Sequence, residues 1–68
     1  MSPVLQATVA AYDERTRDGR VLLDDGRELS FPGAAVRAEV LRLRVGQRVR
    51  MSVQDGEVDA LTLAGLAL

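Results

Sequence analysis

The chain of 68 residues contains no cysteine and no histidine. Without cysteine it can form no disulfide bond, and without both residue types it lacks the usual ligands of protein zinc sites. The Ser-His and Cys-His pairs that activate nucleophiles in many hydrolases are excluded for the same reason. We therefore expect no catalytic residue, no metal site and no cofactor, and the sequence does not indicate an enzyme.

Aromatic residues are scarce, since tryptophan is absent and Tyr12 and Phe31 are the only two aromatic side chains. Lysine is absent as well: nine arginines face ten acidic residues, which gives a formal net charge of −1. A protein that binds nucleic acid mainly through its charge usually carries a basic surplus. Composition alone therefore does not favour nucleic-acid binding.

The length indicates a single domain over residues 1–68, and a domain of this size buries only about 60% of its unfolded surface. The N-terminus lacks the basic opening and uninterrupted apolar run of a signal peptide. The uncharged segment 61–68 is much shorter than the roughly 20 residues that span a bilayer. We therefore expect a cytoplasmic protein that does not associate with a membrane.

Alternation of apolar and polar residues predicts five short strands, over residues 4–12, 20–24, 27–31, 47–53 and 58–63. Turn signals lie at residues 24–26, where Gly26 accepts a positive φ, and at residues 54–57. Pro32 and Gly33 end the third strand, and residues 34–40 are compatible with one or two helical turns that stack Val36 on Val40. This order predicts an all-β fold, a small closed or nearly closed barrel with a short helical turn after the third strand.

Five stretches, in the right order and spacing, resemble the bacterial cold-shock proteins. They are residues 8–13 (TVAAYD), 24–31 (DDGRELSF), 34–36 (AAV), 43–53 (LRVGQRVRMSV) and 60–63 (ALTL). The resemblance covers nearly the whole chain. It implies a five-stranded OB-fold barrel and, as the ligand class of the family, single-stranded RNA or DNA. The following apolar positions are expected in the barrel core: Val9, Val21, Leu29, Phe31, Val49, Met51 and Val53.

The two short RNA-binding motifs of that family fall on residues 16–21 and 29–33 of this chain. The turn and core positions of these motifs are retained in kind, as Gly19, Val21, Leu29 and Phe31. The outward positions, where the family carries stacking aromatic rings and a histidine, are occupied by Asp18, Arg20, Ser30, Pro32 and Gly33. Ala11 stands at the position of the family's first-strand tryptophan. The resemblance therefore implies a scaffold that is kept while its stacking surface is lost.

Stacking on an aromatic ring contributes about 1–3 kcal/mol per base, so losing three stacks removes at most roughly 3–9 kcal/mol. The carboxylates of Asp18 and Glu28 are also expected close to the path of the phosphates. By resemblance, the candidate nucleic-acid-binding residues are Ala11, Tyr12, Arg17, Asp18, Arg20, Ser30 and Pro32. Arg20 could stack on a base or pair with a phosphate, but we favour an exposed cross-strand ion pair with Glu28 or Asp18.

Two hypotheses for the function follow. The first is a small single-stranded nucleic-acid-binding module, of RNA-chaperone or regulatory type, whose binding is weak and salt-sensitive. The alternative is an OB-fold module that has lost nucleic-acid binding and contacts an unidentified protein.

Three further features each have two interpretations. The arginine-rich segment 41–50 is either a phosphate-binding strip or, as we favour, the outer face of strands whose inner residues are Leu41, Leu43, Val49 and Met51. Asp24 and Asp25 are attributed to a hairpin turn rather than to a metal loop. The apolar C-terminal segment is either a frayed end or an edge for a partner or a homodimer, and both remain open. Its leucines are Leu61, Leu63, Leu66 and Leu68.

Overall fold

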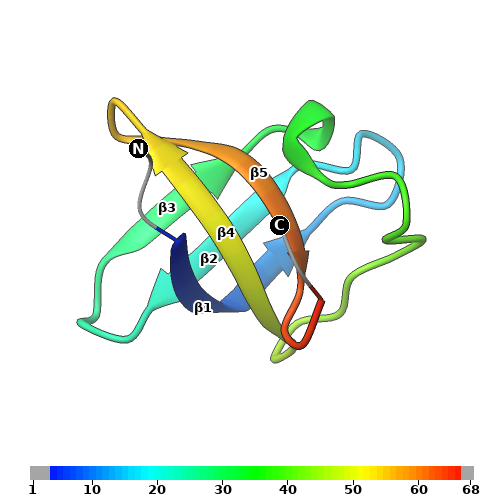
Figure 1. The fold of residues 1–68 in the computed structure, drawn as a ribbon. Coiled ribbons are helices and arrows are strands. Elements are labelled where there is room, and N and C mark those ends of the chain that lie inside the picture. Colours follow the sequence, from blue (N-terminus) through cyan, green and yellow to red (C-terminus); the bar gives the residue numbers. More distant parts are fainter. Residues whose placement is uncertain (1–3, 67–68) are drawn as a thin grey trace.

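The computed structural model describes residues 4–66, which fold as one five-stranded antiparallel sheet with the strand order β3-β2-β1-β4-β5 (Figure 1). The strands are β1 (Val4–Tyr12), β2 (Gly19–Leu23), β3 (Glu28–Phe31), β4 (Arg48–Gln54) and β5 (Glu57–Leu63). All five agree with the predicted strands to within a residue or two at each end. The prediction of an all-β fold is therefore confirmed.

The sheet curls on itself, and in Figure 1 the yellow β4 and the orange β5 pass across β1, β2 and β3. The two ends of the strand order, β3 and β5, approach each other across the interior. After the helical turn that follows β3, Val36 forms a parallel bridge with Leu61, and the backbone N–H of Arg37 donates to the Leu61 carbonyl oxygen at 2.9 Å. The result is a half-barrel whose two ends are joined beside β3.

The interior of the half-barrel holds most of the predicted core. Val9, Val21, Phe31, Val49 and Met51 are each at most 1% exposed. They alternate with exposed or half-exposed neighbours along their strands, as a sheet with one buried face requires. The two remaining predicted core residues are only partly buried and pack against the edge of this cluster; they are Leu29 and Val53.

The helical turn after the third strand is present, but it is shorter than predicted. It is one turn of 3-10 helix, η1 (Gly33–Ala35), instead of one or two turns over residues 34–40. Val36 already has extended backbone angles, φ −73° and ψ 125°, because it pairs with Leu61. Val36 and Val40 are both buried, but they do not stack on a helix. Sheet closure thus overrides the weak helical pattern.

The prediction that Leu41 lies on an inner strand face is wrong. Its side chain is 89% exposed, whereas Leu43 is 3% exposed. The physical reason is that β4 does not begin until Arg48, so residues 41–47 form a loop in which the two-residue alternation of a strand does not apply. Leu43 alone of the two leucines turns into the core.

The turn predicted at residues 54–57 is confirmed as a two-residue connection between β4 and β5. Asp55 and Gly56 both have positive φ, 54° and 79°, which is the conformation that type I′ hairpin turns require. Within residues 4–66, no helix is long and apolar enough to cross a membrane.

Candidate functional site

A groove of about 690 Å³ lies over the β2–β3 hairpin and the turn between β4 and β5. We call it the hairpin groove. It is lined by Asp18, Gly19, Arg20, Ser30, Phe31, Pro32, Gly56 and Glu57. The lining includes four of the seven candidate residues that the sequence indicated, and the side chains of all four are exposed; they are Asp18, Arg20, Ser30 and Pro32.

The register of the hairpin sets which side chains face the groove. Gly19 pairs with Phe31, and Arg20 pairs with Ser30. Because side chains alternate across a strand, Arg20 and Ser30 stand side by side on the outer face while the Phe31 ring points inward. A Cβ atom on Gly19 would lie 2.9 Å from Cζ of Phe31 and would also press against the carbonyl oxygen of Ala11. Glycine is therefore required at the start of β2 by this close approach.

The charges around the groove do not favour a polyanion. Two carboxylates, of Asp18 and Glu57, and one guanidinium, of Arg20, line it. Arg20 also lies 3.9 Å from a Glu28 carboxylate oxygen, and the two side chains are 57% and 52% exposed. This is the cross-strand ion pair favoured from the sequence. A pair this long and this exposed contributes little to stability, so Arg20 can exchange Glu28 for another anion.

The remaining three candidate residues lie outside the groove lining. Ala11 pairs with Arg20, just after a bulge in β1, and Tyr12 packs against the edge of the core. Arg17 has a positive φ of 66°, and its guanidinium donates a hydrogen bond to the backbone carbonyl of Val40. Arg17 therefore ties the loop before β2 to the segment after η1. Its guanidinium is already engaged within the protein.

The sequence did not indicate that Gly56 and Glu57 would contribute to this site. Gly56 belongs to the β4–β5 turn and Glu57 is the first residue of β5, and curling of the sheet brings both beside the end of β3. The turn itself was predicted from its Asp-Gly pair, but its position over another hairpin is a tertiary property. The alternation of apolar and polar residues indicates which face of a strand is buried, but it does not indicate which turns lie close together in the fold.

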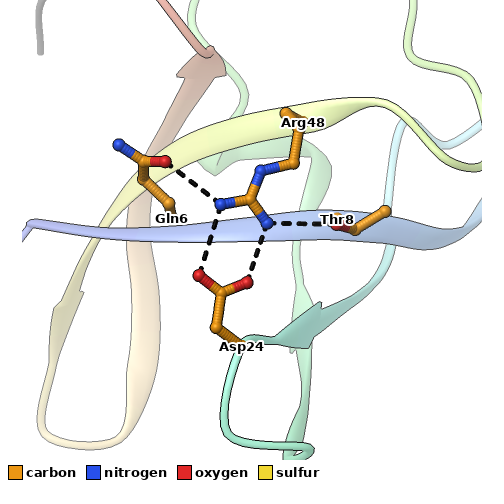
Figure 2. A network of polar contacts seen from close by, with 4 residues as sticks. All are labelled: Gln6, Thr8, Asp24 and Arg48. Carbon is orange, nitrogen blue, oxygen red and sulfur yellow. Dashed lines mark hydrogen bonds and ion pairs between the residues drawn. The ribbon is translucent and has the colours of Figure 1, made fainter.

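A second polar cluster surrounds Arg48 on the outer side of β1 and β4. Figure 2 shows its guanidinium between Asp24, Gln6 and Thr8. It donates to the two Asp24 carboxylate oxygens at 2.8 and 3.3 Å, to Gln6 Oε1 at 3.1 Å and to the Thr8 hydroxyl at 3.2 Å. The hydrogen bonds from Arg48, together with its positive charge, lower the pKa of Asp24. The same hydrogen bonds, together with the carboxylate charge of Asp24, raise the pKa of Arg48. Arg48 is thus already paired within the protein. Asp24 accepts two of its hydrogen bonds and is also the first residue of the β2–β3 turn.

The neighbouring Asp25 stabilises the same turn. Its carboxylate accepts the backbone N–H of Arg27 at 3.0 Å and the Arg27 Nε–H at 2.8 Å. The backbone hydrogen bond is the main reason why the pKa of Asp25 lies below its ordinary value. Both aspartates therefore serve the β2–β3 turn, as the sequence analysis favoured.

The apolar C-terminal segment divides into a buried and an exposed part. Leu61 is fully buried, Leu63 is partly buried, and Leu66 is 42% exposed. Leu68 lies outside the described residues. Of the three leucines that the structure describes, Leu66 offers the most apolar surface to a partner.

Comparison with known proteins finds no match among protein-family models, curated proteins or solved structures. The functional assignment therefore depends on the geometry of the hairpin groove and on the sequence patterns that lead to it.

Proposed function

We propose that the chain is an OB-fold domain of the cold-shock type. The strand order supports this, because β1 pairs with both β2 and β4 and a helical turn lies between β3 and β4. The parallel bridge between Val36 and Leu61 supports it as well, since an OB-fold is a partly open barrel of five strands. Among the described residues Phe31 is buried and Tyr12 is partly buried, so no fully exposed aromatic ring is seen, which sets this chain apart from that type.

The function proposed for the domain is weak, salt-sensitive binding of single-stranded RNA or DNA in the hairpin groove. One observation carries the proposal: the groove combines strands β2 and β3 with the β4–β5 turn. OB-folds bind oligonucleotides on the face of their second and third strands and at the loops that flank it, including the loop between strands four and five. Exposed side chains of the hairpin, Arg20 and Ser30, are then the groups a base or phosphate would meet.

Binding in this groove is expected to be weak for two reasons. Phe31, the aromatic residue of the lining, is 1% exposed and offers no face to a base. Arg20 is the one cation among the described lining residues, and Asp18 and Glu57 repel phosphate. What remains is one guanidinium that can stack on a base or pair with a phosphate. The expected signature is weak affinity that falls with salt, with a slope of about −0.7 for the one phosphate that Arg20 can neutralise, and that hardly depends on base sequence.

The alternative function is contact with a protein. The observation that favours it is the same pair of carboxylates, because Asp18 and Glu57 would attract a basic segment of a partner. Sterically, an open groove of about 690 Å³ accepts several side chains.

The two functions are separated by titrating a fluorescent single-stranded oligonucleotide at two salt concentrations. The variants are Arg20→Ala and, as a matched control, Arg27→Ala, which removes another exposed arginine, one of the β2–β3 turn that does not line the groove. Arg20→Ala should weaken binding by about fivefold or more and reduce the single-strand salt slope by about 0.7, while Arg27→Ala should not.

Three results contradict the nucleic-acid proposal. They are tight, salt-tolerant binding to a pyrimidine oligomer, equal losses in the two variants, and absence of binding at low salt. The last result would leave the protein-contact function as the account of the groove.

A further inference from the structure

The charges of this chain are divided along its sequence. Residues 37–50 carry five arginines and one carboxylate, Glu39, whereas the other residues carry four arginines and nine carboxylates. A nearly neutral protein thus contains one strongly basic segment and a larger acidic part. The basic segment is the connection after η1 together with the first half of β4.

Within this segment, residues 41–45 form an exposed loop that we call the arginine loop. Leu41 is 89% exposed and Val45 is 72% exposed, so two large aliphatic side chains face solvent here. Arg42 and Arg44 are exposed as well, and no carboxylate of the described residues lies within 4.0 Å of either guanidinium. The loop therefore offers unpaired positive charge and uncovered apolar surface together.

The arginine loop is held in place at both ends. Val40 and Leu43 are buried, and the Val40 carbonyl accepts the hydrogen bond from Arg17. On the other side, the backbone N–H of Arg44 donates to Gln47 Oε1 at 3.2 Å, and Gly46 donates to the Val9 carbonyl at 2.8 Å. A loop fixed in this way loses little conformational entropy when a partner covers it.

The hairpin groove has the complementary character. Pro32 supplies apolar surface, and the lining carries two carboxylates, of Asp18 and Glu57, against the single guanidinium of Arg20. Its volume of about 690 Å³ is enough for several side chains. We propose that the arginine loop of one copy docks in the hairpin groove of a second copy. The guanidinium groups of Arg42 and Arg44 pair with the groove carboxylates, and the aliphatic side chains cover the apolar part.

The occupant is a second copy because both halves of the contact are present in this chain. With a net charge of −1, two copies do not repel each other strongly at long range. The contact is heterologous, since loop and groove are different surfaces. It also occupies the candidate ligand site, so self-association and ligand binding exclude each other. The proposal goes beyond the proposed function and does not depend on which ligand the groove takes.

Sedimentation at low salt over a range of protein concentrations tests the proposal. Two charge-reversal variants are made, Arg42→Glu with Arg44→Glu, and Asp18→Arg with Glu57→Arg. Each variant alone should associate at least about tenfold more weakly than the wild type, because loop and groove then carry like charge. An equimolar mixture of the two should associate again, since each loop then meets a groove of opposite sign.

The matched control is Arg15→Glu with Arg27→Glu, which reverses two exposed arginines outside loop and groove. It should associate like the wild type. A further variant, Leu41→Ala with Val45→Ala, should weaken association without a change of charge. Circular dichroism verifies that every variant is folded. A wild type that stays monomeric at millimolar concentration and low salt overturns the proposal, as does a mixture that associates no better than its components.

Discussion

Replacing Phe31 by alanine tests the core beneath the hairpin groove. The ring is 1% exposed, and it lies so close to Gly19 that no side chain fits between them. Truncating such a buried phenylalanine costs about 3–5 kcal/mol, because the lost burial adds to the cost of the cavity. The total stability of a domain this small is expected near the lower end of the usual range of about 5–15 kcal/mol. Phe31→Ala should therefore leave much of the protein unfolded at room temperature.

Thermal unfolding followed by circular dichroism measures the effect. For a domain of this size, about 1 kcal/mol corresponds to a shift of roughly 4–8 °C, so Phe31→Ala should lower Tm by about 12–40 °C. Leu41→Ala is the control, because that side chain is 89% exposed and its loss should change stability by no more than about 0.5 kcal/mol. An unchanged Tm for Phe31→Ala would mean that the ring lies on the surface. The inward register of β3 would then be refuted.

Two further predictions concern the hairpin. Gly19→Ala should destabilise the protein strongly and lower its urea midpoint, because the added methyl group meets the Ala11 carbonyl. Gly26→Ala should destabilise it less, because nothing lies within 4 Å of the added methyl group and only the positive φ disfavours alanine there. Stability should stay nearly constant at neutral pH and decrease as the pH falls below about 4, because Asp24 and Asp25 have pKa values lowered from 3.8 and stabilise the fold only while ionised. Asp24→Asn should reduce this loss of stability at acidic pH. If the pH dependence of Tm were the same in Asp24→Asn as in the wild type, the stabilising role of the Arg48 network would be contradicted.

The strands and turns follow from local patterns that the sequence states directly. Alternation around Val21 and Met51 predicts the buried face, and the Asp-Gly pair at residues 55 and 56 predicts a turn that the positive φ angles confirm. Both signals depend on neighbouring residues only. For that reason the all-β fold and most of the core could be predicted.

Features that depend on sheet closure could not be predicted in the same way. The helical pattern after β3 is cut short because Val36 pairs with a residue of β5 that is distant in sequence. Leu41 has the apolar character of a core residue, but it lies in a loop before β4, where strand alternation does not apply and Leu43 is the buried leucine. Arg17 resembles a surface cation in sequence, although its guanidinium bonds to Val40 across the fold. For Val36 and Arg17, a long-range contact overrides the local preference.

The candidate site combines both kinds of information. The resemblance indicated the outward positions of the hairpin, and the register of β2 and β3 brings Arg20 beside Ser30. The contribution of Glu57 comes from the curl of the sheet and adds a negative charge that the motif comparison did not include. This second carboxylate repels phosphate and attracts basic groups, so it favours a self-contact or a protein partner over nucleic acid.

The central claim is that the hairpin groove is an OB-fold ligand surface from which the aromatic contacts are missing. The most direct test restores them, with Asp18→Phe, Arg20→Phe, Ser30→Phe and Pro32→His in one variant, whose affinity for a single-stranded oligonucleotide is measured beside the wild type. Since all four side chains are exposed, the variant should fold, and binding should gain about 1–3 kcal/mol for each base that stacks on a ring. A folded, monomeric variant that binds the oligonucleotide no better than the wild type would contradict the claim.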